Sequence, residues 1–556
     1  MITSPQDTIE QYQKNGLWEG VLLHQWLQRC ADASPQQLAI ADQPTRTTLA
    51  GEPPLRLTFL QLQRASTNLA AQLLQQGIGR EDRVIVQLPN IAELVVCYMA
   101  VSAIGAIISP LPVQYGGHEL KHVDQALSAK AYIAIETLNG QAFAEPQSQH
   151  LSDGCRLLCF GQSLSLDTQE NQAAASVLAE HQQQQSLSAN DIFTVCWTSG
   201  TTGMPKGVPR SHNMWGTVGR NCIEAGDYQQ GDRLLNPFPL VNMASVGSFL
   251  YPFVMLGCSL VLHHPFDPPV FLQQIQAEAI NFTIVPPAML NQLAKNEALW
   301  NPFDFSQLRS IGSGSAPLSP WMIDIFDNRY QKKIVNYYGS NEGINLFAKP
   351  ETAPDAETRA SMFPRFGAAG IDWPTAAART IATKVIDPES GAEITEPGKA
   401  GELVVKGPTV FAGYWQTDNR DVFTEDGFFK TGDLVEICGE GDRFYRIAGR
   451  SKDIINRGGM KLSPAEIDVL LEGLPGAVEA AVCAYPDEDM GEKICACVVA
   501  ENTEQPLGLD DIKSYLLEKG IAKIKLPERL ELFERLPRNP LGKVQRFMLQ
   551  DTVASR

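Results

Sequence analysis

The chain has 556 residues, of which 44% are hydrophobic and 19% are charged, a composition typical of a soluble globular protein. A chain of this length exceeds what one hydrophobic core usually holds, so we expect at least two domains. The net charge of −18 argues against nucleic acid or an anionic membrane as the main partner. The eleven cysteines form no Cys-x-x-Cys pairs, which favours free thiols in a reducing cytoplasm.

The first hundred residues predict alternating helices and strands. Residues 1–30 alternate apolar and polar side chains without a secretion signal, and 57–77 read as a helix followed by a strand at 84–88. Residues 94–113 carry no charge and approach the length of a membrane span, but Gly105, Pro110 and Pro112 interrupt them. We therefore expect a buried helix at 91–104 and a strand at 106–109. This alternation predicts a parallel sheet with helices on both faces.

A hydroxyl- and glycine-rich loop follows a polar stretch. Residues 140–190 are rich in Gln, Ser and Ala, and we expect a surface segment with little chemistry. The uncharged run 192–197 has the length of a buried strand. The loop itself reads Thr198, Ser199, Gly200, Thr201, Thr202, Gly203, Met204, Pro205, Lys206 and Gly207.

Such a loop suits a phosphate group. Glycines let the backbone approach an anion, hydroxyl and N–H groups donate to it, and one ammonium offsets its charge. The spacing is not that of the common nucleotide loop, because Pro205 precedes Lys206 and Gly207 follows it. From the loop alone, a flexible polar hairpin is an equal alternative.

The rest of the chain continues the alternation and then changes character. We expect strands near 258–262 and 281–285, and helices near 268–278 and 287–295. After a charged turn at 450–453, the sequence predicts a compact α+β unit: helix 467–471, strands 478–484 and 494–499, and helix 510–519. We place the domain boundary between residues 449 and 450.

Further motifs follow in order. They are Gly312-Ser-Gly-Ser-Ala-Pro317, Asn336-Tyr-Tyr-Gly-Ser-Asn-Glu342, Thr431-Gly-Asp433, Tyr445-Arg-Ile-Ala-Gly-Arg-Ser-Lys-Asp453 and Pro537-Arg-Asn-Pro-Leu-Gly-Lys-Val544. Each alone has an ordinary interpretation: a tight turn, a surface acid or a solvated charge. Together with the loop at 198–207, the series resembles the adenylate-forming superfamily over nearly the whole chain.

The resemblance implies a fold and a domain division. The expected fold class is α/β, with a large N-terminal domain of α/β layers plus a distorted β-barrel and a small, mobile α+β C-terminal domain. The expected domains are an AMP-binding domain at 1–449 and a lid domain at 450–556 that carries the catalytic lysine. In this family the small domain closes over the large one and then rotates about a hinge.

The resemblance also assigns roles to residues. Lys543, Glu342 and Lys206 are the expected catalytic residues, with Glu342 as the Mg²⁺ ligand. Lys543 should contact the acid and the α-phosphate, and Lys452 occupies the hinge. Tyr338 should stack on adenine and Asp433 should bind the ribose. Asn341 replaces the usual Thr and can still donate a hydrogen bond toward the α-phosphate. The remaining expected ATP-binding residues are Thr198, Ser199, Gly200, Thr201, Thr202, Gly203, Gly314, Ser315, Ala316, Asn336, Tyr337, Gly339, Ile447 and Arg450; Gly458 and Gly459 should lie on the CoA side.

The predicted acyl pocket contains Asn242, Met243, Val246 and Gly339. Asn242 stands where the family has an aromatic gate. Dihydroxybenzoate ligases resemble this chain but carry their Asn at the position that Met243 occupies here, so the Asn of this chain is shifted. This shift argues against dihydroxybenzoate as the substrate. Apolar residues around Met243 favour a medium- or long-chain fatty acid or an alicyclic acid, although they are equally compatible with ordinary core.

The resemblance therefore predicts an ATP-dependent acid–CoA ligase of the cytoplasm that forms an acyl-adenylate and transfers it to CoA. Its substrates are ATP, CoA and a small acid; its cofactor is Mg²⁺. A ligase that loads the phosphopantetheine arm of a carrier protein is the alternative. A catalytically silent binding protein is a third class, which the joint presence of Lys206, Glu342, Asp433, Arg450 and Lys543 argues against.

Overall fold

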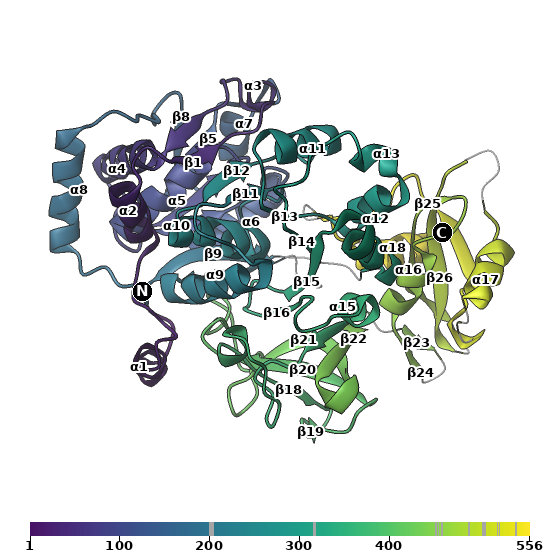
Figure 1. Cartoon of the computed structure of the whole chain (residues 1–556). Coiled ribbons are helices and arrows are strands. Elements are labelled where there is room, and N and C mark those ends of the chain that lie inside the picture. Colours follow the sequence, from purple (N-terminus) through teal and green to yellow (C-terminus); the bar gives the residue numbers. More distant parts are fainter. Residues whose placement is uncertain are drawn as a thin grey trace.

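The computed structural model describes residues 1–198, 205–314, 318–450, 453, 455–457, 460–487, 490–502, 507–519, 521, 523–539 and 542–556, with backbone only at 450, 456, 460 and 461. Three large sheets build the part of the chain up to Arg450, which we call the body, and a fourth builds the remainder, the cap. Figure 1 shows the cap at one end of the molecule, beside α12 (Pro287–Lys295).

The first sheet has eight strands and is mostly parallel. Their order is β16 (Asn345–Ala348), β15 (Lys333–Gly339), β14 (Ser310–Gly314), β13 (Phe282–Ile284), β11 (Arg233–Asn236), β12 (Ser259–Leu262), β1 (Leu38–Ala41) and β2 (Arg56–Thr58). Strands β16 and β2 are antiparallel to their neighbours and close its two edges.

The second sheet has six strands. Their order is β10 (Lys206–Ser211), β9 (Ile192–Thr198), β4 (Ile107–Pro110), β3 (Arg83–Gln87), β5 (Ala131–Ile135) and β8 (Arg156–Phe160). Strand β10 is antiparallel to β9, so it forms a hairpin at one edge of a sheet that is otherwise parallel.

One hydrophobic core joins both sheets through the helices between them. Every residue of α5 (Ala92–Ile104) is buried, because this helix packs on all sides and needs no polar face. The other helices of this region are α1 (Gln6–Lys14), α2 (Leu23–Ala33), α3 (Arg46–Ala50), α4 (Phe59–Gln75), α6 (Gly117–Leu127), α7 (Ala144–Ser148), α8 (Gln172–Gln184), α9 (His212–Gly226), the π-helix η1 (Met243–Leu250) and α10 (Tyr251–Leu256).

A second core covers the other face of the first sheet. The helices that follow η1 and α10 along the chain are α11 (Pro268–Ala277), α12, α13 (Glu297–Trp300), α14 (Pro320–Ile325), the π-helix η2 (Phe326–Tyr330) and α15 (Ala356–Ser361). The predicted helices near 268–278 and 287–295 correspond to α11 and α12 and are confirmed.

The third sheet has six strands and stays open within the described residues. Their order is β17 (Met362–Pro364), β22 (Phe444–Arg450), β21 (Phe429–Cys438), β20 (Ala400–Lys406), β18 (Ala382–Ile386) and β19 (Glu393–Ile394). The α/β fold class is confirmed, but the distorted barrel within it is an open sheet, because the outer strands β17 and β19 each pair on one side only. Two short helical turns, η3 (Ala377–Arg379) and η4 (Glu440–Asp442), and the hairpin β6 (Thr137–Leu138) and β7 (Gln141–Ala142) complete the body.

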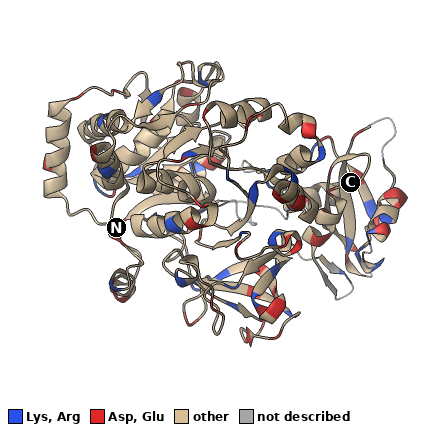
Figure 2. Cartoon of the chain, viewed as in Figure 1, with Lys and Arg blue, Asp and Glu red and all other residues tan. Residues whose placement is uncertain are grey.

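The cap is the α+β unit that the sequence predicts. Its strands are β24 (Met460–Leu462), β23 (Ile455–Arg457), β26 (Gly491–Ala500), β25 (Ala477–Asp487) and β27 (Arg529–Leu532); its helices are α16 (Pro464–Leu471), α17 (Leu509–Glu518), η5 (Lys523–Lys525) and α18 (Arg546–Ser555). Figure 2 shows acidic residues on α17, where Asp510 and Asp511 occupy the first turn. The exact boundary at 449/450 stays a prediction; β22 ends at Arg450.

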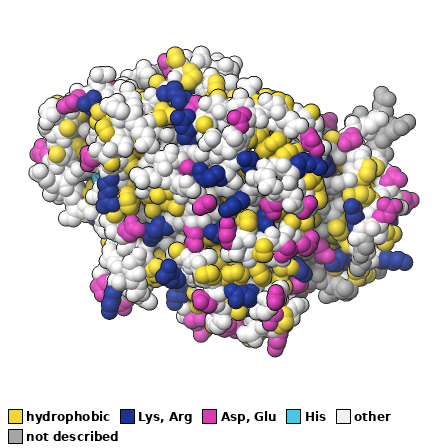
Figure 3. All heavy atoms as spheres, in the orientation of Figure 1, with side chains coloured by type: hydrophobic (Ala, Val, Ile, Leu, Met, Phe, Trp, Pro, Cys, Tyr) yellow, Lys and Arg dark blue, Asp and Glu magenta, His cyan; other side chains and the backbone are white. Residues whose placement is uncertain are grey.

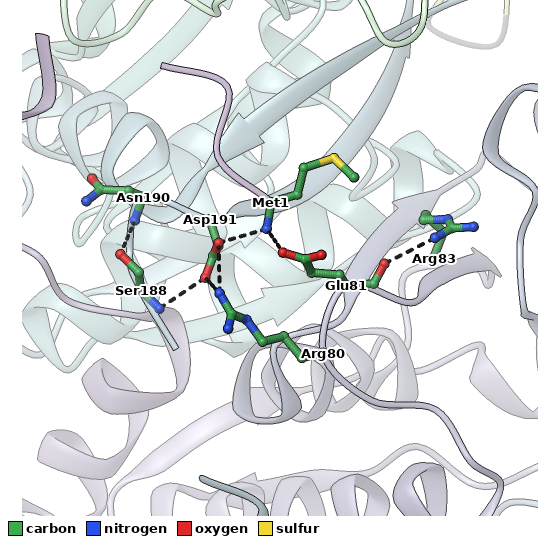
Figure 4. Close-up of polar contacts among 7 residues, drawn as sticks. All are labelled: Met1, Arg80, Glu81, Arg83, Ser188, Asn190 and Asp191. Carbon is green, nitrogen blue, oxygen red and sulfur yellow. Dashed lines mark hydrogen bonds and ion pairs between the residues drawn. The ribbon is translucent and has the colours of Figure 1, made fainter. Parts of the chain in front are cut away.

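The start of β9 is fixed by a cluster of polar contacts around Asp191 (Figure 4). The carboxylate of Asp191 accepts from the Met1 ammonium at 2.8 Å, from Arg80 Nη2 at 3.2 Å and from the Ser188 N–H at 3.2 Å. The Met1 carbonyl in turn accepts from the Ile192 N–H at 2.8 Å. These bonds hold the strand that leads to the glycine-rich loop.

The apolar stretch at 94–113 forms α5 and β4, as predicted, and none of the described helices has the length and hydropathy of a membrane span. On the face seen in Figure 3, acidic and basic side chains are interspersed with hydrophobic ones. The expectation for 140–190 is wrong in part, because β8 within it is a largely buried strand that pairs in parallel with β5.

Candidate active site

The glycine-rich loop connects the two strands of the β9–β10 hairpin. Thr198 ends β9 and Lys206 begins β10, and the two residues are paired in register. The Thr198 hydroxyl donates to the Lys206 carbonyl at 3.4 Å. The predicted loop residues Ser199, Gly200, Thr201, Thr202 and Gly203 lie outside the described part of the chain. The ends of the loop are therefore fixed by sheet pairing, and His122 Nε2 lies 2.9 Å from the Pro205 carbonyl beside it.

Lys206 and Glu342 meet through the ring of Tyr414. The Lys206 ammonium lies 4.9 Å from the ring centre, and the Tyr414 hydroxyl donates to Glu342 Oε1 at 2.9 Å. The neighbouring Trp415 N–H donates to the Gly207 carbonyl at 2.8 Å, which brings this segment against β10. A side chain at 207 would stand 3.1 Å from Trp415 Cβ, so glycine permits the approach.

Sequence reasoning missed Arg210, which supports the same corner of the site. Its side chain is fully buried and donates to the carbonyls of Asn341 at 2.7 Å and Thr409 at 2.8 Å. Its guanidinium also lies 4.5 Å from the ring centre of Trp215. Burial lowers the pKa of Arg210 to about 10, so the group remains charged at neutral pH. The sequence carries no signal for this role, because β10 also begins with Lys206 and an arginine in such a strand looks the same at a surface.

Tyr338 and Asp433, the predicted adenine and ribose residues, are in direct contact. The Tyr338 hydroxyl donates to Asp433 Oδ2, and the Tyr338 ring lies 5.4 Å from that of Phe363. Asp433 is 5% exposed and sits on β21 opposite Arg450 of β22. Ile447, on the same strand, is 37% exposed. Strand β15 of the first sheet and β21 of the third therefore bring the two groups expected at the base and the sugar into contact.

The side-chain amides of the two asparagines in the 336–342 motif form hydrogen bonds to main-chain groups. Asn336 is buried, and its amide nitrogen donates to the carbonyls of Arg359 and Ala360, both at 3.0 Å. Asn341 Oδ1 accepts from the Met243 N–H at 2.8 Å, and its Nδ2 lies 3.4 Å from the Trp197 carbonyl. Asn341 thus links the strand before the phosphate loop to the start of η1.

The predicted acyl residues lie at the junction of β15 and η1. Gly339 is exposed, and a side chain there would stand 3.9 Å from Met243 Cγ. Asn242 begins η1: its Oδ1 accepts from the Ser245 N–H at 3.3 Å. Val246 is fully buried. The described contact of Asn242 is a helix cap, and its role as a gate stays a prediction.

Two further predicted residues lie at the end of the first sheet. Gly314 is paired with Tyr337, and a side chain there would stand 2.3 Å from the Tyr337 carbonyl, so only glycine fits. The adjacent Ser315 and Ala316 are outside the described residues. Tyr337 itself points to the face of β15 that η1 and α9 cover, opposite to Tyr338.

Lys543 lies on the cap in a short turn. Its N–H donates to Asn539 Oδ1 at 2.9 Å, its carbonyl accepts from the Asn539 N–H, and its side chain is exposed. The cap contacts the body elsewhere, where the Ser319 hydroxyl donates to Glu472 Oε2 at 3.0 Å. The hinge residue Lys452 and the CoA-side residues Gly458 and Gly459 are not among the described residues.

The residues present fit a divalent cation. Glu342 is 9% exposed, and its carboxylate retains acceptor capacity beyond the bond from Tyr414. Carboxylate oxygens are the ligands that Mg²⁺ prefers, and a bound nucleotide would supply the others. Lys206, Glu342 and Asp433 have the chemistry of the three predicted roles, a cation for phosphates, a metal ligand and an acceptor for hydroxyls, and these roles stay predictions.

Comparison with known proteins agrees with this arrangement. The family model described as AMP-binding enzyme matches residues 28–415, and the AMP-binding enzyme C-terminal domain matches residues 466–543. The chain belongs to this family of adenylate-forming enzymes.

Relatives and a solved structure extend the match over the full length. The chain is 30% identical to triostin synthetase I of Streptomyces triostinicus, over 99% of this chain and 98% of that protein. It is 29% identical to the medium-chain fatty-acid–CoA ligase of Escherichia coli, over 98% and 93%. The ATP-bound MatB of Rhodopseudomonas palustris superposes with a TM-score of 0.75 at 25% identity, over 96% of this chain and 99% of that one.

Proposed function

We propose that the chain is an ATP-dependent acid–CoA ligase that activates a carboxylic acid as its acyl-adenylate and passes the acyl group to CoA. The observation that carries the proposal is the contact series Lys206–Tyr414–Glu342, which brings an ammonium and a carboxylate together at one end of the glycine-rich loop. The sequence favours a fatty or alicyclic acid, and the free cysteines suit a reducing compartment such as the cytoplasm.

The first step replaces a poor leaving group with a good one. A carboxylate oxygen attacks the α-phosphorus of ATP, and the bond to the β-phosphate oxygen breaks to release pyrophosphate. Lys206 would offset charge on the departing phosphates, and Mg²⁺ held by Glu342 would neutralise more of it. Asp433, held by Tyr338, would accept hydrogen bonds from the ribose hydroxyls.

The cap would serve both steps. In the first, Lys543 would donate to the acid and to the α-phosphate while negative charge moves between them. In the second, the CoA thiolate attacks the acyl carbonyl and AMP leaves with the bonding electrons. Because Lys543 is exposed on a turn of the cap, whose sheet is separate from those of the body, cap movement is the expected means of bringing it to the acid.

The alternative acceptor is the phosphopantetheine thiol of a carrier protein. Acyl-adenylate formation is the same in both cases, so the residues of the body favour neither. The distinction rests on the thiol that takes up the acyl group.

The test measures pyrophosphate release by the full chain with MgATP and a panel of acids, with and without free CoA. We expect release that depends on an acid and an acyl-CoA product when CoA is present. Absence of release with every acid would refute the ligase function. Thioester formed only on an added carrier protein, with none on CoA, would establish the alternative.

A further inference from the structure

Two buried polar side chains lie just inside the entrance at Gly339. In the β15–β16 pairing, Gly339 is directly opposite Asn345, so both positions face the same side of the sheet. Gly339 is exposed, whereas Asn345 is 5% exposed. Tyr337, two residues before Gly339, projects on that same side. A side chain at 339 would stand 3.2 Å from the Ile344 carbonyl oxygen and 3.9 Å from Met243 Cγ, so glycine keeps this position unfilled, and Asn345 and Tyr337 follow on the same side of the sheet.

Neither side chain is satisfied within the described part of the protein. Asn345 Oδ1 and the Tyr337 hydroxyl are fully buried and have no hydrogen-bond partner there. The amide nitrogen of Asn345 has only a long contact, 3.9 Å, to Cys222 Sγ. A buried polar group without a partner costs about 1–3 kcal/mol, so two such atoms in one place call for an explanation.

The neighbouring polar groups cannot supply the missing partners, because they bond among themselves. The Ser248 hydroxyl donates to Cys222 Sγ at 3.5 Å, and the Tyr228 hydroxyl donates to the Ser248 carbonyl at 3.0 Å. On the sheet side, the Tyr337 ring lies over Gly312 among hydrophobic side chains, Phe282 and Ile284. Burial, and to a lesser extent Cys222, raise the pKa of Tyr337 well above its usual value, so it remains a neutral hydroxyl.

We propose that the acid activated by this enzyme carries a hydrogen-bond donor, a hydroxyl or a ring N–H, on the part that passes Gly339, and that Asn345 Oδ1 accepts from it beside the Tyr337 hydroxyl. The inference rests on the proposed function and narrows its acid. An unsubstituted methylene chain would leave both buried atoms unpaired, whereas a hydroxyl both donates and accepts and can serve the two.

The test compares acids in matched pairs that differ in one donor: benzoate with its three monohydroxy isomers, hexanoate with hydroxyhexanoates, and 1-naphthylacetate with indole-3-acetate. The readout is kcat/KM for acid-dependent pyrophosphate release. We expect at least one donor-bearing acid to exceed its unsubstituted partner by about tenfold to a hundredfold, the size of one buried hydrogen bond. Asn345→Leu, which keeps the branching of the side chain but removes its polar atoms, should bring that ratio near one and improve the unsubstituted acid.

Controls separate this inference from the ligase function. Asn328→Leu, an exposed asparagine of η2, should leave the ratio unchanged. If Asn345→Leu does not fold, Tyr337→Phe tests the same preference with one atom removed. The inference is wrong if unsubstituted acids are the better substrates, or if the kcat/KM ratio of donor-bearing to unsubstituted acid is unchanged in both variants. Asn345 and Tyr337 are then structural residues, and the ligase function still stands. If no acid in the panel is activated, the ligase function itself fails.

Discussion

The body and the cap hold their candidate catalytic groups in different ways. In the body, Lys206 and Glu342 share Tyr414, and Asp433 is bonded to Tyr338. In the cap, Lys543 is exposed on a turn that Asn539 closes. The body thus holds its groups in place without a ligand, whereas the cap is proposed to bring its lysine into place by movement. The following variants test this difference between body and cap.

The largest effect is expected from Lys543→Ala. Removing the only group that the cap is proposed to contribute to adenylation should lower acid-dependent pyrophosphate release by about a hundredfold to a thousandfold. Conversion of preformed acyl-adenylate and CoA to acyl-CoA should change little, because Lys543 is proposed to act in the first step and the cap to rotate away from that position before the second. Lys519→Ala, an exposed lysine of the cap, is the control. A native rate of adenylation in Lys543→Ala would show that the cap lysine is dispensable.

Arg210→Met should weaken the body. The change leaves the carbonyls of Asn341 and Thr409 buried without their charged donor, which should lower the free energy of unfolding by about 2–4 kcal/mol. Tryptophan fluorescence during urea denaturation measures this in the body alone, because all eight tryptophans precede residue 450. Arg420→Met, at an exposed arginine, should have no effect. An unchanged midpoint in Arg210→Met would mean that the buried guanidinium does not stabilise the site.

Low pH should destabilise the body through its buried histidines. All eight histidines of the chain precede residue 450, so this effect is confined to the body. Burial lowers the pKa of His24 and of His264 to about 4, and that of His212 well below its usual value. Between pH 6.5 and 4 the unfolded chain binds protons at these histidines that the folded chain does not bind, so stability falls as pH falls. His24 and His264 should each cost about 2 kcal/mol at pH 5.

His24→Gln isolates one of these contributions, because glutamine can keep a hydrogen bond to Ser102. Between pH 7 and pH 5 this variant should lose about 2 kcal/mol less stability than the parent, measured by the same denaturation. His118→Gln, at an exposed histidine, should follow the parent. Identical pH profiles for His24→Gln and the parent would contradict the assignment.

The smallest effect is expected from Tyr414→Phe. The ring that packs on Lys206 remains, but Glu342 loses a donor that orients it. Changing a residue that orients a metal ligand costs about tenfold to a hundredfold, and we expect the lower end, seen as slower pyrophosphate release and a higher Mg²⁺ requirement. Tyr515→Phe in the cap should be neutral. An unchanged Mg²⁺ titration for Tyr414→Phe would remove Tyr414 from the organisation of the site.

The sequence predicts the regular elements well where a pattern repeats. The helix expected at 91–104 is observed as Ala92–Ile104, and the strand expected at 281–285 as Phe282–Ile284. It fails at 140–190, because β8 is a short strand within a polar region and α8 buries only Ala174 and Leu178. Neither leaves a strong periodic signal, and both depend on partners far away in the chain.

For the candidate site, motifs locate residues but not their contacts. Nothing in the sequence indicates that Arg210 is buried, since a single arginine looks the same on a surface strand. The motif at 336–342 suggests a phosphate contact for Asn341, yet its amide is engaged by Met243 and Trp197. The apolar character expected near Met243 overlooks Asn345, which becomes its neighbour only when β15 and β16 pair.

Trp415 joins three parts of the body that are remote in sequence. Its main chain bonds to Gly207 of β10, its indole N–H donates to the Ala126 carbonyl of α6 at 3.0 Å, and it adjoins the Tyr414 ring. The strand that leaves the glycine-rich loop therefore cannot shift without displacing α6 and the connection between β20 and β21 of the third sheet. We expect a movement at Lys206 to be transmitted to these two elements.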